Sequence, residues 1–192
     1  MSFIVKLAFS LFIPAMIFII SIQKAQAATS ASTEFKATIV GGSCDISAPA
    51  TVPINKGVVI PSEDIIGGNS PVEVFELTLS NCKGYGLTPV ITLEGDVDST
   101  SGIPLFLANT SSTKGFGILV TFDGNSNFKE NKNLAKDKKI TASNKAWSTT
   151  IASVLNGTIP LNASVSCGNC ATEAEIQGGE LKANITFNFS YN

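Results

Sequence analysis

The last twelve residues alternate between apolar and polar side chains without a break. The apolar positions are Leu181, Ala183, Ile185, Phe187, Phe189 and Tyr191, and the residues between them are polar. A period of two predicts a β-strand with one apolar face and one polar face. Because the sequence ends directly after this strand, we expect its apolar face to be covered by an earlier part of the chain or by another molecule.

Shorter apolar runs, rich in β-branched residues and separated by turn residues, predict strands along the rest of the chain. No stretch shows a convincing helical period. Short strands at this spacing are typical of an all-β sandwich or barrel. The predicted strands cover residues 35–46, 52–60, 72–82, 87–93, 103–108, 116–122, 139–142, 147–155, 158–165 and 181–191.

The N-terminal residues 1–27 are predicted to be a secretory signal peptide. Lys6 precedes an apolar run over residues 7–22, and Ala25-Gln26-Ala27 forms an A-x-A cleavage signal. The alternative is an uncleaved membrane anchor, but the run is short for a bilayer span and contains Pro14. We therefore expect an exported domain over residues 28–192 that is not inserted in the membrane after cleavage. Within it, residues 28–34 form an N-terminal arm and residues 35–192 form the sandwich.

Charge and cysteine content narrow the class of protein further. The chain has 13 basic and 15 acidic side chains, and removal of Lys6 and Lys24 leaves 11 basic ones. This mild acidity argues against a nucleic-acid partner. All four cysteines lie beyond the cleavage site, so an oxidising compartment makes disulfides the expected state.

The first cysteine pair, Cys44 and Cys82, lies at the ends of two predicted strands. A bridge between them closes a loop of about 39 residues, for which the chain-entropy estimate is roughly 4 kcal/mol. The second pair, Cys167 and Cys170, forms a C-x-x-C sequence. A local disulfide that pins a loop is the simplest interpretation. Redox exchange and metal binding are the alternatives for this pair.

Residues that carry catalysis are missing from the sequence. The chain has no histidine, which excludes Ser–His and Cys–His nucleophiles and histidine metal sites. Carboxylate pairs such as Glu63-Asp64 and Asp96/Asp98 lie in polar stretches and are interpreted as solvated loop charges. We therefore expect no enzyme, no catalytic residue, no cofactor and no metal site.

Three features together resemble the subunits of chaperone–usher pili (fimbriae), similar to those of type 1 fimbriae. The first is the alternating terminal strand with Tyr191 as the penultimate residue and Gly179 fourteenth from the end. The second is the segment 75–82, which ends in Asn-Cys, together with the segment 35–40 that runs towards Cys44. The third is the segment 115–120 before Asp123-Gly124. The resemblance covers residues 28–192.

This resemblance implies an incomplete immunoglobulin-like sandwich that lacks its final strand. In that family a periplasmic chaperone lends a strand to the open groove, and at the outer-membrane usher the arm of the next subunit replaces it. The resemblance then implies a fibre subunit at the cell surface that takes part in adhesion, with chaperone, usher and neighbouring subunits as partners. It places Gly179, Leu181, Ala183, Ile185, Phe187, Phe189 and Tyr191 on the groove wall, and Thr29, Ala31, Thr33 and Phe35 on the donated arm.

Two departures from the family pattern refine the expectation. The arm residues Thr29, Ala31 and Thr33 are small, which favours a minor subunit that polymerises inefficiently on its own. The C-x-x-C pair is outside the common pattern. The alternative function is a secreted carbohydrate-binding sandwich, such as a tip adhesin, with Trp147 and Tyr85 as candidate sugar-stacking residues. A periplasmic thiol oxidoreductase is a third class, which rests on Cys167 and Cys170 alone.

Overall fold

The computed structural model of the chain describes residues 33–38, 41–170 and 176–192. The predicted signal peptide, its cleavage site and residues 28–32 of the arm lie outside these ranges. One compact unit covers Ile39–Asn192. Of the helices in the described ranges, none has the length and apolar character that a membrane crossing requires.

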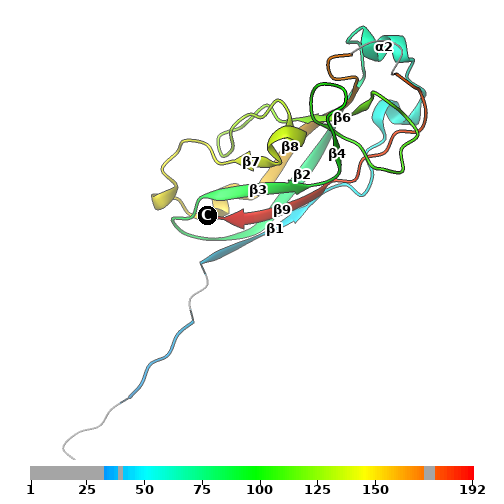
Figure 1. Cartoon of the computed structure of the whole chain (residues 1–192). Coiled ribbons are helices and arrows are strands. Elements are labelled where there is room, and N and C mark those ends of the chain that lie inside the picture. Colours follow the sequence, from blue (N-terminus) through cyan, green and yellow to red (C-terminus); the bar gives the residue numbers. More distant parts are fainter. Residues whose placement is uncertain (1–32, 39–40, 171–175) are drawn as a thin grey trace, which may run out of the picture. The chain divides into compact units, whose positions relative to one another are not determined.

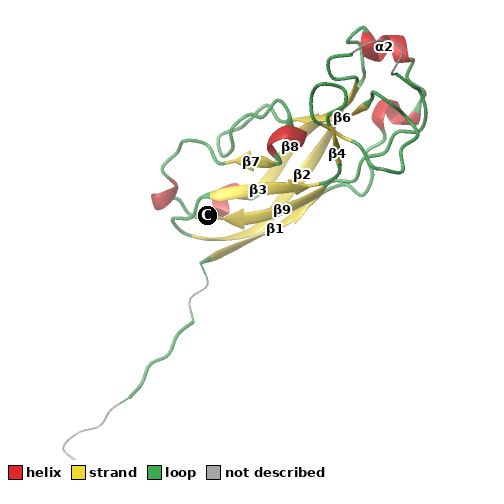
Figure 2. Ribbon diagram, in the orientation of Figure 1, coloured by secondary structure: helices red, strands yellow, loops and turns green. Residues whose placement is uncertain are grey.

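The compact unit is built almost entirely from β-strands joined by loops and single-turn helices (Figures 1 and 2). The strands are β1 (Gly42–Ser47), β2 (Val72–Gly84), β3 (Pro89–Glu94), β4 (Val97–Asp98), β5 (Leu105–Phe106), β6 (Gly117–Thr121), β7 (Lys139–Thr141), β8 (Gly157–Ser166) and β9 (Thr186–Tyr191). The helices are η1 (Ile54–Gly57), α2 (Ser62–Ile66), α3 (Leu134–Asp137), η2 (Trp147–Thr149) and η3 (Ala152–Leu155).

Two antiparallel sheets enclose the core. The larger has the strand order β1-β2-β8-β6-β5-β4 and the smaller has the order β7-β3-β9. Every recorded strand pair is antiparallel. Side chains from both sheets meet between them, and the most deeply buried include Leu77, Leu79, Ile91, Phe106, Phe122, Phe128, Leu134, Ile140 and Leu161.

The strand order is that of an immunoglobulin-like sandwich with one position empty. A constant-type immunoglobulin domain has strands A, B, E and D in one sheet and C, F and G in the other. Here β1, β2, β8 and β6 follow the order A, B, E, D, and β3 and β9 follow the order C, F. In the described residues no strand takes the place of G beside β9. The predicted all-β, incomplete immunoglobulin-like fold is thus confirmed.

Two of the predicted strands are wrong. Residues 52–60 contain the single turn η1 and no strand, because Asn55 and Lys56 adopt left-handed backbone conformations with φ of 53° and 54°. Residues 147–155 form η2 and η3, in which Ala152 and Leu155 are buried three residues apart, the spacing of a 3₁₀ turn.

Other predicted strands have different bounds. The strand predicted from residue 35 begins only at Gly42, and residues 33–38 have no regular structure. The short helices α2 and α3 were not predicted. The terminal strand begins at Thr186, so residues 181–185, which were predicted to be part of it, lie outside the strand.

Candidate functional site

The outer edge of β9 pairs with no other strand of the described residues. On its inner side β9 pairs with β3, from Thr186 opposite Glu94 to Tyr191 opposite Pro89. The Asn192 N–H donates to the Thr88 carbonyl at 2.9 Å, so the even-numbered residues direct their backbone groups towards β3. The N–H and C=O groups of Phe187, Phe189 and Tyr191 therefore face the other way. In the part of the chain that the structure describes, no strand pairs with them.

The side chains along this edge are only half-buried. Leu181, Ala183, Ile185, Phe187, Phe189 and Tyr191 are all partly covered, whereas each residue between them is exposed. The alternation of an apolar inner face and a polar outer face is thus present. All but Leu181 pack against the main core, and Leu181 packs against a smaller cluster around Ile65 and Phe116.

Across from β9, the edge strand β1 of the larger sheet runs close by (Figure 1). The two approach most tightly at one end, where a Cβ built on Gly42 would lie 2.9 Å from the Tyr191 ring. Further along, the rings of Phe75 and Phe187 are 6.3 Å apart. Cys44, Ile46 and Phe75 are half-buried like the β9 side chains and pack on the same core. We call this region, between the free edges of β1 and β9, the open seam.

The chain before β9 is fixed by two serines that sequence reasoning missed. The Ser111 Oγ donates to the Lys182 carbonyl and accepts from the Lys182 N–H, both at 3.0 Å. The Ser112 Oγ accepts from the Glu180 N–H at 2.8 Å. Hydroxyl groups thus satisfy backbone groups of residues 180–182, and this positions the start of the seam.

Gly179 has a steric role at the same place. A Cβ at this position would lie 2.6 Å from the Ser112 Oγ and 3.0 Å from the Ser112 carbonyl oxygen. Any larger residue would push the terminal segment away from residues 111–112. The glycine that the sequence pattern selected is therefore required by a close backbone approach.

The Tyr191 hydroxyl is buried and makes no hydrogen bond within the described residues. Burial raises the pKa of this phenol above its ordinary value. Its ring packs edge-on against Phe189, with centroids 4.9 Å apart. An unpaired buried hydroxyl costs stability, so the Tyr191 end of the seam is a place where the described residues leave a polar group unsatisfied.

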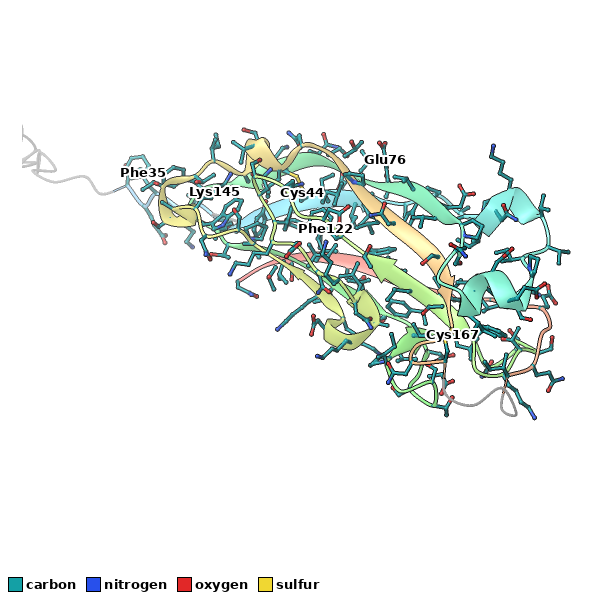
Figure 3. The ribbon with its side chains drawn as sticks, turned by 90° about the horizontal axis from the view of Figure 1, so that it is seen from above. Phe35, Cys44, Glu76, Phe122, Lys145 and Cys167 are labelled. Carbon is teal, nitrogen blue, oxygen red and sulfur yellow. A yellow bond between two sulfur atoms is a disulfide. The ribbon has the colours of Figure 1, made fainter. Side chains whose placement is uncertain are left out.

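Both predicted disulfides, Cys44–Cys82 and Cys167–Cys170, are present. The first joins β1 to β2 at a bulge, where Asn81 adopts a φ of 52° and donates to the Asp45 carboxylate at 2.8 Å. Figure 3 shows Cys44 and Cys167 in different parts of the sandwich. All four cysteines are thus oxidised and none of them is free.

Of the predicted arm residues, the structure describes only Thr33 and Phe35, since Thr29 and Ala31 precede its first described residue. Both are exposed, and the Phe35 side chain is 91% accessible. Lys36 and Glu34 form an exposed ion pair at 3.2 Å. The described part of the arm thus offers a large apolar side chain that its own segment does not cover.

The candidate sugar-stacking residues differ in accessibility. Trp147 is 6% exposed, its Nε1–H donates to the Ser143 carbonyl, and Lys145 covers its ring at 4.3 Å. Its faces are therefore not presented for stacking, and Tyr85 alone of the two is accessible. Within the described ranges, no group of three or more His, Cys, Asp or Glu side chains is arranged to hold a metal.

No protein-family model matches the chain, and no curated protein matches it. One of the solved structures that resemble it is described as the crystal structure of the P pilus rod subunit PapA. That chain is 17% identical, with a TM-score of 0.44, and the match covers 84% of this chain and all of the other. A likeness at this level does not bear on function, which has to be inferred from the geometry of the open seam.

Proposed function

We propose that this protein is a structural subunit of a bacterial surface pilus that takes a β-strand from another protein at the open seam. The observation that carries the proposal is the β9 edge, where unpaired backbone groups and half-buried apolar side chains coincide. Strand addition at a sheet edge uses the backbone for affinity and the alternating side chains for specificity. The empty position of strand G beside β9 supports the proposal, because a strand added there would complete the sandwich.

The expected partners are those that would prevent aggregation at such an edge. An exposed apolar edge promotes aggregation, so the chain needs cover from the moment of export. A periplasmic chaperone that lends a strand, an outer-membrane usher and neighbouring subunits would supply this cover in turn. The protein would reach the cell surface within the fibre and contribute to adhesion there. Its small arm residues Thr29, Ala31 and Thr33 support a minor subunit.

A labelled peptide of residues 28–40, added to the purified mature chain, tests the proposal by fluorescence anisotropy. A second peptide with Ala31→Ile and Thr33→Ile offers a better apolar fit. We expect saturable binding, tighter for the second peptide. Phe187→Asp places a charge on the inner face and should abolish binding, because burying an unpaired carboxylate is unfavourable.

The matched control is Asn188→Asp, which changes the outer face of the same strand and should bind the peptides as the unmodified chain does. Binding by neither peptide, or equal binding by both variants, would contradict the proposal. Saccharide binding without peptide binding would favour the carbohydrate-binding alternative, for which the accessible Tyr85 is the remaining candidate.

A further inference from the structure

Two groups of exposed apolar side chains lie at opposite ends of the sandwich. The first, which we call the Tyr85 face, consists of Tyr85, Ile151 and Val154, all exposed. Tyr85 and Ile151 form a backbone bridge, and Ile151 and Val154 are three residues apart around the start of η3. Partners in an antiparallel bridge direct their side chains to the same side, so Tyr85 and Ile151 share one surface, and Val154 follows three residues after Ile151.

The second group, the α2 face, consists of Val58, Val59 and Ile66, and Val59 is 86% exposed. Neighbouring Ile60 and Ile65 pack inward against Phe116 and Cys167. The strand β2 separates the two faces, because α2 precedes its first residue, Val72, and Tyr85 follows its last. A strand of that length spans roughly 40 Å. Figure 1 shows α2 and the start of β1 at different ends of the sandwich.

The charges around the two faces are of opposite sign. The chain around the Tyr85 face, residues 81–88 and 143–156, contains Lys83 and Lys145 and no acidic residue. The chain around the α2 face, residues 54–71, contains Glu63 and Asp64 in the exposed first turn of α2, and Lys56. Apolar groups framed by opposite charges are the ordinary composition of two surfaces that bind each other.

We propose that the Tyr85 face of one subunit docks on the α2 face of a second copy of this chain. The inference rests on the proposed function. β9 runs from the α2 end of the sandwich towards Tyr191. A donated strand that pairs antiparallel with β9 therefore starts near Tyr191 and ends near the α2 end. A donated arm continues into the β1 of its own subunit, which begins at Gly42, paired with Gly84 next to Tyr85. Donation therefore brings the donor's Tyr85 face to the acceptor's α2 face.

Such a contact is heterologous, since it joins two different surfaces, and it repeats along a fibre without closing. It also complements the short arm with its small side chains. The end-to-end contact adds buried apolar surface that does not depend on how well the arm fills the seam. Association between whole subunits should thus be stronger than binding of the isolated arm peptide.

Sedimentation equilibrium of the mature chain and three variants tests the docking. Ile151→Asp alters the Tyr85 face and Val59→Asp alters the α2 face. The control Val74→Asp changes a comparably exposed aliphatic residue on the outer surface of β2. We expect the wild type to form dimers and short oligomers. Ile151→Asp and Val59→Asp should each weaken this about tenfold, the change that one central interface residue typically causes, and Val74→Asp less than about twofold.

Mixing the two weakened variants tests direction. The Ile151→Asp chain keeps an intact α2 face and the Val59→Asp chain keeps an intact Tyr85 face, so together they should form heterodimers at wild-type strength. The docking proposal would be overturned if Val59→Asp associated as strongly as the wild type. It would also be overturned if the wild type did not self-associate at its highest soluble concentration. Binding of the arm peptide should be unchanged in all three variants. If the peptide fails to bind the wild type, it is the proposed strand addition that fails.

Discussion

The strands β2 and β9 carry the same alternating pattern but have different surroundings. At Leu79, β2 has a partner on each side, with Ile46 of β1 and Gly157 of β8, and the Leu79 side chain is 1% exposed. At Phe187, β9 has among the described residues a partner on one side only, Leu93 of β3, and the side chain is partly exposed. The same pattern thus gives a closed core in one region and an open seam in the other. Burial is decided by the neighbouring strand and not by the pattern alone.

The two disulfides provide the largest expected effect. Removing the first with Cys44→Ala and Cys82→Ala should lower the free energy of unfolding by about 4 kcal/mol, because its loop is long. Removing the second with Cys167→Ala and Cys170→Ala should lower it by about 2 kcal/mol, because a four-residue loop restricts little unfolded-chain freedom. Urea denaturation of both double variants measures the difference. An equal loss in both would show that loop length does not govern these bridges.

Truncating the two alternating strands separates the closed core from the seam. Leu79→Ala should lower the free energy of unfolding by about 3 kcal/mol, within the range for a fully buried leucine. Phe187→Ala should cost the free chain less, about 1–2 kcal/mol, because its ring is only partly buried at the strand edge. Thermal denaturation with and without the arm peptide completes the comparison. The peptide should stabilise Leu79→Ala as it does the wild type, and should stabilise Phe187→Ala much less.

An equal loss of stability in Leu79→Ala and Phe187→Ala would contradict the distinction between the two regions. So would equal stabilisation of both variants by the peptide. In that case Phe187 would belong to a closed core, and the seam would lie elsewhere.

The sequence predicted those parts of the fold in which the position of a residue within its own strand decides whether its side chain faces the core. The apolar pattern located β2 and β8 as short apolar runs and the two faces of β9 by period-two alternation. It failed at residues 52–60, where the turn at Asn55 and Lys56 overrides the β-branched content. It failed again at residues 147–155. Trp147, Ala152 and Leu155 are buried there in turns, and apolar content alone does not distinguish such turns from a strand.

The candidate site was predicted in part for the same reason. Gly179 and the apolar residues of β9 could be found, because they lie in one continuous segment. The contacts of Ser111 and Ser112 with residues 180–182 could not, since they join segments about 70 residues apart through single hydroxyl groups. The two end faces were missed as well, because exposure of Tyr85, Ile151 and Val59 depends on which neighbours the fold places around them.

A smaller effect is expected from changes to the arm. Thr33→Ile in the arm peptide should tighten its binding to the mature chain roughly three- to tenfold, because it adds apolar surface on the side that would face the seam. Ser32→Ile adds comparable apolar surface on the opposite side and serves as the control. Anisotropy titrations compare the two peptides. Equal gains would mean that the arm does not bind as a strand with the predicted facing.

Hydrogen exchange of the β9 amides, measured by NMR, tests most directly that this edge is open. In the free chain the N–H groups of Phe187, Phe189 and Tyr191 should exchange faster than those of Asn188, Ser190 and Asn192, which are directed at β3. Adding the arm peptide with Ala31→Ile and Thr33→Ile should slow the three fast amides by at least about tenfold and leave the other three little changed. Uniform slow exchange along β9 in the free chain, unaffected by the peptide, would contradict the open seam.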